Sequence, residues 1–232
     1  MSTVSSQRSA SPTTPAPELK IIQIPLWAAD TNAWVVGNDD GVSLLIDAPP
    51  EPARVGEVVR ERGLTIGAVL LTHGHIDHMG GSGEVAAETG AAVYVHPDDD
   101  FLTRDPVSQL MAFFGTNLPG NYDAPEEMES LTDGEVLDLA GLSIEVRHTP
   151  GHTPGHCCFY VEEIESLFSG DQLFAGSIGR TDFPYGSHAD LMASMRTKVL
   201  VLPDETRVLP GHGPETTIAK ERIGNPFREE WG

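Results

Sequence analysis

The distribution of hydrophobic and polar residues predicts alternating strands and helices from residue 19 onward. Apolar runs of strand length occupy residues 19–26, 32–36, 42–46, 66–71 and 91–95. Two stretches with helical spacing, 52–62 and 83–89, interrupt these runs, and each is followed by a glycine. The run 66–71 is apolar throughout, which is typical of a strand covered on both faces. This order predicts a layered α/β fold.

Residues 96–131 break this pattern with charged clusters, prolines and one expected short helix at 107–114. We interpret residues 96–131 as an insertion. It either forms a lid or wall of a pocket or is a surface elaboration, and the sequence favours neither role. Residues 1–18 are rich in Ser, Thr and Pro, which predicts a disordered tail before one domain, 19–232. Further strands are predicted at 135–139, 142–147, 157–161, 166–168 and 207–209, and a helix at 189–200.

The charge and the cysteines narrow the classes of function. Lys plus Arg number 14 against 35 for Asp plus Glu, so the net charge is 14 − 35 = −21. This charge repels nucleic acid and anionic lipid, and no apolar run approaches the roughly 20 residues of a membrane span. We therefore expect neither a nucleic-acid nor a membrane partner. The two cysteines, Cys157 and Cys158, are adjacent and cannot link distant segments, so a cytoplasmic location is expected.

The strongest chemical signal directly follows the fully apolar run. The segment Thr72-His73-Gly74-His75-Ile76-Asp77-His78 places four potential metal ligands within six residues. On a helix these four side chains would point in different directions, whereas in a loop beyond a strand end they can converge. Imidazole and carboxylate groups are the usual ligands of Zn, Fe and Mn. We therefore predict a metal site here.

Three more polar residues share one context, each directly after a glycine at the end of a predicted strand. They are His152, Asp171 and His212. Taken singly, each is as typical of a cap or a turn. Ligands in α/β folds gather outside the carboxyl ends of strands, so we expect these loops and the 72–78 loop to face one pocket.

The remaining histidines have structural interpretations. His148 is expected to support the loop that carries His152, and His156 to open a strand. His96 and His188 are expected at surface or cap positions. Cys157 and Cys158 should point to opposite faces of their strand.

These motifs resemble those of the metallo-β-lactamase superfamily, in which H-x-H-x-D-H precedes a distal His, Asp and His. The resemblance extends over residues 19–226. Segments 170–184 and 210–214 are most similar to glyoxalase II-like hydrolases of the short bacterial type. The fold that this resemblance implies is an αββα sandwich, two mixed sheets between helices.

The resemblance also implies two divalent metal ions, with zinc expected and iron or manganese as alternatives. Bound water at such a site has a pKa of about 7 instead of about 15.7, so hydroxide is available. We expect it to hydrolyse a thioester of a small thiol, similar to S-lactoylglutathione, with Asp77 orienting the hydroxide. Arg180 is expected to bind the substrate, although an ion pair with Asp182 is equally compatible. The implied ligands are His73, His75 and His152 for one ion, Asp77, His78 and His212 for the other, and Asp171 as the bridge.

Other activities remain compatible with the same residues. The persulfide dioxygenases share this fold and bind one Fe(II), which His73, His152 and Asp171 would hold here. A hydrolase of another ester or a lactone is a further alternative. Typical glyoxalase II ends in a helical domain that binds glutathione, but only 20 residues follow His212. The thiol part of the substrate therefore stays open, as does the oligomeric state.

Overall fold

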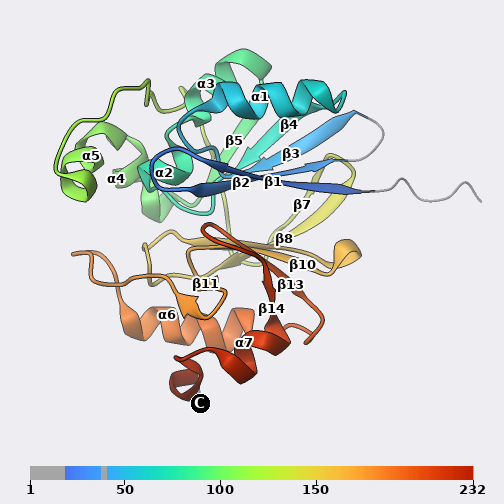
Figure 1. Ribbon diagram of the computed structural model, residues 1–232, viewed down its shortest axis with the longest axis vertical. Coiled ribbons are helices and arrows are strands. Elements are labelled where there is room, and N and C mark those ends of the chain that lie inside the picture. The colour runs from blue at the N-terminus through green and yellow to red at the C-terminus, as the bar shows by residue number, and fades with distance from the viewer. Residues whose placement is uncertain (1–18, 38–40, 232) are drawn as a thin grey trace, which may run out of the picture.

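The computed structural model describes residues 19–37 and 41–231, and its centre is a pair of six-stranded sheets packed face to face (Figure 1). The strand orders are β1-β2-β3-β4-β5-β6 and β14-β13-β10-β9-β8-β7. Both sheets contain parallel and antiparallel pairs, and helices cover both outer faces. The predicted αββα sandwich is confirmed. The predicted tail, 1–18, lies outside the described residues.

The first sheet comes from the N-terminal half of the chain, and helices α1 (Pro52–Glu61) and α3 (Ser82–Thr89) cover it. Side chains of a strand alternate between faces, so Val35 packs under these helices whereas Trp34 packs between the sheets. All seven residues of β2 are therefore buried. The strands are β1 (Lys20–Leu26), β2 (Thr31–Gly37), β3 (Val42–Ile46), β4 (Thr65–Leu70), β5 (Ala92–Val95) and β6 (Glu129–Ser130).

The second sheet comes from the C-terminal half and is covered by α6 (His188–Ser194), its π-helical continuation Met195–Val199, and α7 (Ile218–Gly224). Cys157 packs between the sheets and Cys158 against the helical layer, which confirms the predicted opposite directions. The strands are β7 (Val136–Leu139), β8 (Leu142–His148), β9 (Cys157–Val161), β10 (Ser166–Gly170), β13 (Arg207–Pro210) and β14 (Thr216–Thr217), beside a small hairpin of β11 (Leu173–Phe174) and β12 (Ser177–Ile178).

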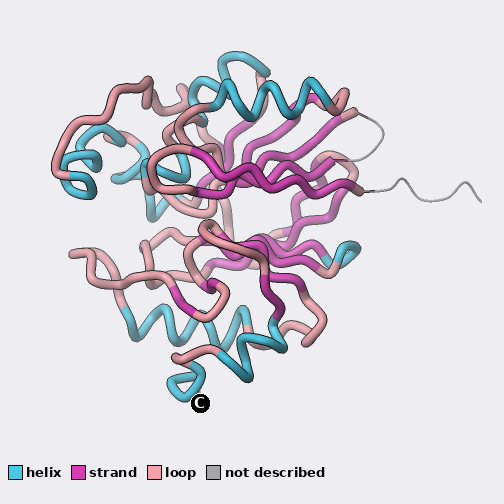
Figure 2. Tube along the Cα trace, in the orientation of Figure 1, coloured by secondary structure: helices cyan, strands magenta, loops and turns pink. Residues whose placement is uncertain are grey.

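The segment 96–131 folds into a 3-10 turn at Pro97–Asp99, helices α4 (Asp100–Thr103) and α5 (Pro106–Phe114), and β6. These helices lie at one edge of the sandwich, where Figure 2 also shows loops from both halves of the chain. A further short helix, α2 (Ile76–Met79), begins inside the histidine motif, which the sequence analysis expected to be loop throughout. No helix within the described ranges is long and apolar enough to cross a membrane.

Candidate metal centre

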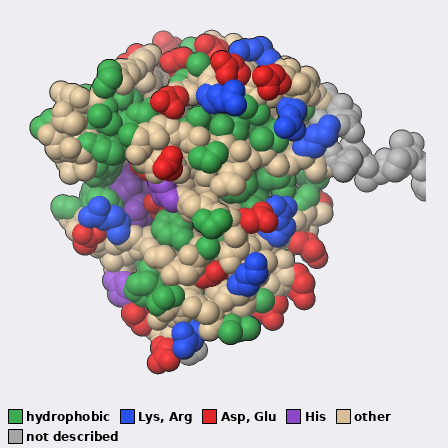
Figure 3. All heavy atoms as spheres, viewed as in Figure 1, with side chains coloured by type: hydrophobic (Ala, Val, Ile, Leu, Met, Phe, Trp, Pro, Cys, Tyr) green, Lys and Arg blue, Asp and Glu red, His purple; other side chains and the backbone are tan. Residues whose placement is uncertain are grey.

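Four loops meet at this edge of the sandwich because strands of both sheets end there. The strands β4, β8, β10 and β13 lead into the loops that carry the predicted ligands. The loop with His212 is fastened to the first sheet, since the backbone N–H of Asn32 donates to Gly211 O at 2.7 Å and Thr31 forms an isolated bridge with His212. Figure 3 shows histidine side chains grouped in a recess at this edge. The structure brings together all seven predicted ligands: His73, His75, Asp77, His78, His152, Asp171 and His212.

His73, His75 and His152 form a first group of converging imidazoles. Nδ1 of His75 lies 3.0 Å from Nε2 of His73 and 3.0 Å from Nε2 of His152. Burial lowers the pKa of His73 and His75 well below the ordinary value, and the neighbouring histidines lower both further. The rings are therefore neutral near pH 7 and offer lone pairs to a cation. Three such nitrogens form a common ligand set for Zn or Fe.

Asp77, His78 and His212 form a second group beside the first. Nε2 of His212 lies 3.3 Å from Nε2 of His78 and 3.3 Å from Oδ2 of Asp77. Burial works to lower the pKa of His78, but the nearby carboxylates, above all Asp171, raise it well above the ordinary value. Burial likewise works to raise the pKa of Asp77, but His78 and His212 lower it on balance. This group therefore favours a positive charge among its side chains, which a divalent cation would supply.

Asp171 lies between the two groups. Its Oδ1 is 3.3 Å from Nε2 of His78, and its Oδ2 is 3.4 Å from Nε2 of His152. Oδ1 is buried and accepts no hydrogen bond, which is costly for a carboxylate unless a cation is near. The space beside it depends on Gly211, where a Cβ atom would lie only 2.4 Å from Oδ1. The donor set of these residues therefore fits the binding of divalent cations.

Each of the five histidines also has a partner on its outer nitrogen. Such partners fix the orientation of a ring and determine which nitrogen is left for a metal. The pairs are His73 Nδ1 with Thr72 Oγ1 (3.0 Å), His75 Nε2 with Tyr185 Oη (2.9 Å), His78 Nδ1 with Asp47 Oδ2 (2.8 Å), His152 Nδ1 with Arg180 O (2.8 Å) and His212 Nδ1 with Ala29 O (3.2 Å).

Asp47 supports both groups at once. Its carboxylate accepts from the backbone N–H and the hydroxyl of Thr72, which contacts His73, and its Oδ2 faces His78. Its backbone has φ of 57°, a left-handed conformation that non-glycine residues rarely adopt and that is often retained at functional sites. Asp47 was not predicted from the sequence. The available signal was a polar residue directly after the predicted strand 42–46, the same context as the ligands.

His156 was interpreted only as the start of a strand, but it holds the bridging residue in place. It is fully buried, and its Nε2 accepts the backbone N–H of Asp171 at 3.0 Å. Burial lowers its pKa, so the ring is neutral and able to accept. Gly170 permits this arrangement, because its φ is +48° and a Cβ there would lie 2.7 Å from the ring. The Gly-His pair at 155–156 repeats the pair at 151–152 and was the available signal.

The segment 96–131 supports the site directly. Asp99 accepts hydrogen bonds from the backbone N–H groups of Gly74 and Gly155, and so joins two ligand loops. Gln109 of α5 accepts from the backbone N–H of Ile76 and donates to the carbonyl of Gly74. The segment therefore forms part of the wall of the site.

The other predicted residues have mixed outcomes. Nε2 of His148 donates to the carbonyl of Pro154, so its predicted support of the loop is confirmed. The predicted cap position of His96 is confirmed too, since its side chain accepts from the backbone N–H of Asp98. Nε and Nη2 of Arg180 donate to the carboxylate of Asp182, both at 2.7 Å. This is the ion pair that the sequence analysis considered; a substrate contact by Arg180 stays a prediction.

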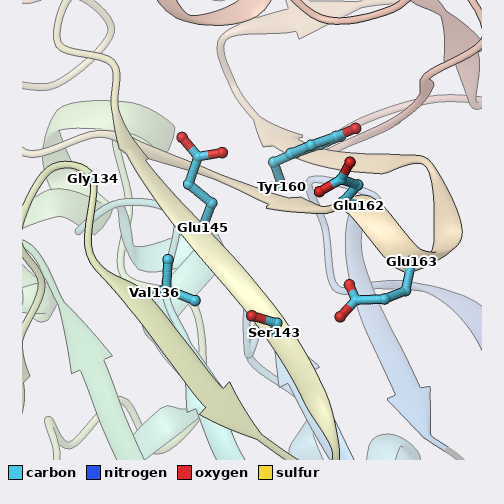
Figure 4. A pocket seen from close by; sticks show the side chains of 7 residues that line it. All are labelled: Gly134, Val136, Ser143, Glu145, Tyr160, Glu162 and Glu163. Atoms are coloured by element: carbon cyan, nitrogen blue, oxygen red, sulfur yellow. The ribbon is translucent and has the colours of Figure 1, made fainter.

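A separate hollow lies on the second sheet, toward the opposite end of β8 and β9 (Figure 4). Acidic side chains and Tyr160 line it, and none of the predicted ligands does. Glu145, at its side, is already paired with Arg147. We assign it no part in the metal centre. The lining residues are Gly134, Val136, Ser143, Glu145, Tyr160, Glu162 and Glu163.

Comparison with known proteins identifies the class to which this fold and site belong. The model of the metallo-β-lactamase superfamily matches residues 26–212. The chain therefore belongs to this superfamily of metal-dependent hydrolases. It is 38% identical to the hydroxyacylglutathione hydrolase GloC of Haemophilus influenzae, over 88% of this chain and 95% of that protein. It is also 35% identical to the probable metallo-hydrolase YqgX of Bacillus subtilis, over 90% of this chain and 97% of that protein.

Solved structures give a consistent picture. BLEG-1, a B3 metallo-β-lactamase, superposes with a TM-score of 0.84 at 36% identity, covering 90% of this chain and 99% of that one. TTHA1623 in a di-iron-bound form superposes with a TM-score of 0.79 at 38% identity, covering 89% of this chain and 99% of that one. ETHE1 from Myxococcus xanthus is more distant, with a TM-score of 0.73 at 28% identity. The match covers 91% of this chain and 88% of that one.

Proposed function

We propose that this protein is a dinuclear metal-dependent hydrolase of thioesters of small thiols. The observation that carries the proposal is the position of Asp171 between the two groups: its Oδ1 lies 3.3 Å from Nε2 of His78, and its Oδ2 lies 3.4 Å from Nε2 of His152 and 3.6 Å from Nε2 of His212. A single-metal site has no need of the second group, so the geometry favours two ions over the mononuclear iron of the persulfide dioxygenases. The similarity to GloC supports the thioester as the substrate class.

Divalent ions held there would lower the pKa of bound water from about 15.7 to about 7 and polarise the substrate carbonyl. Asp77 would accept a hydrogen bond from the nucleophilic water; the hydroxyl of Thr31 donates to its Oδ2 at 3.0 Å, which supports this role by holding the carboxylate. The ring centroids of Phe113 and Phe183 lie 5.0 Å and 4.9 Å from that of His75 and give this side of the site an apolar lining. A thiolate is a good leaving group because a free thiol has a pKa of about 8.5, so no strong general acid is required.

Zinc is the proposed metal, with iron and manganese as alternatives, since imidazole and carboxylate ligands accept all three. The similarity to a di-iron protein gives iron specific support. A cytoplasmic location is proposed on the ground that Cys157 and Cys158 are both free and buried.

The test combines metal analysis with a substrate panel. We expect about two metal ions per chain. We also expect hydrolysis of S-lactoylglutathione or of another small thioester. A lactone and a β-lactam are tested as competing substrates of a hydrolase, and oxygen uptake with glutathione persulfide tests for dioxygenase activity. Asp171→Asn should lose tight metal binding and activity together, whereas Asp138→Asn, at an exposed position, should change neither. One ion per chain with persulfide-dependent oxygen uptake would instead identify a dioxygenase.

A further inference from the structure

Asp99 is a buried carboxylate within the segment 96–131, and no role was predicted for it from the sequence. Its Oδ2 accepts hydrogen bonds from the backbone N–H of Gly74 at 2.9 Å and from the hydroxyl of Thr153 at 2.7 Å. Its Oδ1 accepts from the backbone N–H of Gly155 at 2.6 Å. A carboxylate without such partners would be costly to bury, so these three donors define where Asp99 lies.

The donors lie beside the ligands of the first group. Gly74 separates His73 from His75, and Thr153 directly follows His152. The three imidazoles come from two loops that are far apart in the sequence, and one carboxylate binds the backbone or side chains of both. It therefore sets the distance between the loops, and with it the distances among the three ring nitrogens.

Both loops also pack directly against the turn that carries this carboxylate. A Cβ atom on Gly155 would lie 2.7 Å from Cγ of Asp99. A Cβ atom on Gly74 would lie 2.8 Å from Cβ of Leu102, in α4. No side chain fits between either loop and the turn, so a displacement of Asp99 is passed on to the loops.

The second group has supports of its own. The hydroxyl of Thr31 donates to Oδ2 of Asp77 at 3.0 Å, and Nδ1 of His212 lies 3.2 Å from the carbonyl oxygen of Ala29. Within the described part of the chain, no hydrogen bond joins Asp99 to a ligand of this group. The two groups are thus held by different parts of the molecule.

We propose that Asp99 is a positioning residue for the first metal ion, the one that His73, His75 and His152 would hold, and that the second ion does not depend on it. The segment 96–131 then determines the affinity of one of the two metal positions, beyond its place in the wall of the site. This inference rests on the proposed dinuclear function.

The test is Asp99→Asn, which keeps the size of the side chain but places an NH2 group opposite a donor in either orientation. It is combined with His212→Ala, which keeps the three histidines of the first group, and separately with His152→Ala, which keeps the second group. We expect zinc affinity, measured by chelator competition, to fall by about 10- to 100-fold in the His212→Ala protein and to stay within about threefold in the His152→Ala protein.

Two further variants complete the design. Asp100→Asn is the matched control, because the carboxylate of this neighbouring residue pairs with Arg104 at the surface and its loss should change neither affinity. Thr153→Val removes one of the three donors and should weaken the first ion alone, to a smaller extent. It provides the measurement if Asp99→Asn does not fold, which circular dichroism shows.

The outcomes separate a positioning role from a general one. Equal losses of affinity in the two single-group proteins would show that Asp99 only stabilises the fold, and an unchanged affinity in the His212→Ala protein would show that it does not position the first group. If the wild type bound a single zinc ion, the dinuclear function would be wrong. The proposal for Asp99 would then stand if Asp99→Asn weakened that ion, and it would be wrong if the affinity stayed the same.

Discussion

At the residue scale, the geometry of the centre depends on side chains that would not themselves bind a metal. Asp47 is the clearest case, because it contacts His78 directly and His73 through Thr72. Removing its acceptor oxygen would free the rings of both groups to rotate. Each rotation moves a ligand nitrogen away from its ion.

We therefore predict that Asp47→Asn weakens metal binding by roughly 10- to 100-fold, the range typical of partners of metal-binding histidines. Asparagine keeps the size of the side chain but places an N–H group where one of the carboxylate oxygens was. Chelator competition measures the effect, and Asp138→Asn again serves as the control. Equal metal affinity of Asp47→Asn and wild type would show that Asp47 has no part in ligand orientation.

The convergence of the seven predicted ligands could be anticipated from the sequence because each follows a strand end or a glycine in a local pattern. Asp47 and Tyr185 could not, because their roles arise from contacts across 25 and 110 residues of chain. His156 is an intermediate case, since its Gly-His context was visible but its contact with Asp171 was not.

At the element scale, one side chain of α5 forms hydrogen bonds with the backbone of the histidine motif. Gln109 makes buried hydrogen bonds to the backbone of Gly74, Ile76 and Leu102. Gln109→Ala would leave these backbone groups without partners in a buried environment. We predict a loss of about 1–3 kcal/mol in the free energy of unfolding, measured by denaturant titration.

The matched control is Ser108→Ala, one residue earlier on α5. Ser108 is exposed and its hydroxyl donates to Asp105 O. Its replacement should change stability by less than about 0.5 kcal/mol. Similar losses in both variants would indicate that the effect belongs to the helix and not to the contact of Gln109.

A second prediction at this scale concerns the turn before α4. The ring of His96 stacks on that of His148, with centroids 4.0 Å apart. Burial is the main cause that lowers the pKa of His96, and the neighbouring His148 lowers it further. Asp98 and Asp133 act in the opposite direction but do not outweigh these two effects. Because its folded-state pKa is below the unfolded value of about 6.5, the folded protein binds fewer protons in this window. Stability is therefore lost as pH falls through about 6.5 toward the folded-state pKa.

His96→Asn removes the titrating ring and keeps a cap acceptor for the turn. We predict that its free energy of unfolding falls less than that of the wild type when the pH is lowered from about 7.5 to about 5.5, with metal removed from both. His188→Asn, at an exposed position, is the control for the change of residue type. Parallel pH profiles for wild type and His96→Asn would contradict the assignment.

The longer elements agree with their predicted ranges to within about two residues, because their hydrophobic periods are clear. The missed elements are short or lack a period. β11 and β12 have two residues each, and α2 has four, two of which face the metal site instead of the core. Helix α7 (Ile218–Gly224), with seven residues, was not predicted either. The two mixed sheets between helices followed from the family resemblance, but the order of strands within each sheet was not predicted, because the hydrophobic pattern carries no information on pairing.

At the scale of the whole molecule, the metal centre joins the two halves of the sandwich. His73, His75, Asp77 and His78 follow a strand of the first sheet, whereas His152, Asp171 and His212 follow strands of the second. Ions bound to the folded state alone would stabilise it by about 4.1 kcal/mol when their free concentration is 1,000 times Kd.

We therefore predict that a chelator lowers the thermal unfolding midpoint of the wild type and that added metal restores it. Asp171→Asn should show little response to either treatment, since it lacks the bridge between the two groups. Differential scanning calorimetry at constant protein concentration measures the unfolding midpoints of the wild type and of Asp171→Asn, with chelator and with added metal. A midpoint of the wild type that is insensitive to chelation would contradict a metal pair shared between the halves.

The bond between Asn32 and Gly211 has a consequence for how the protein is made. It ties the loop of the last ligand to one of the first strands, so the binding site is closed only when residue 212 has emerged from the ribosome and folded back onto β2. A nascent chain that displays only the first four ligands has no complete position for either ion. Under the proposed assignment, the second ion would be captured only after residue 212 has folded back onto β2, whereas the ligands of the first ion would be complete once Asp171 is in place.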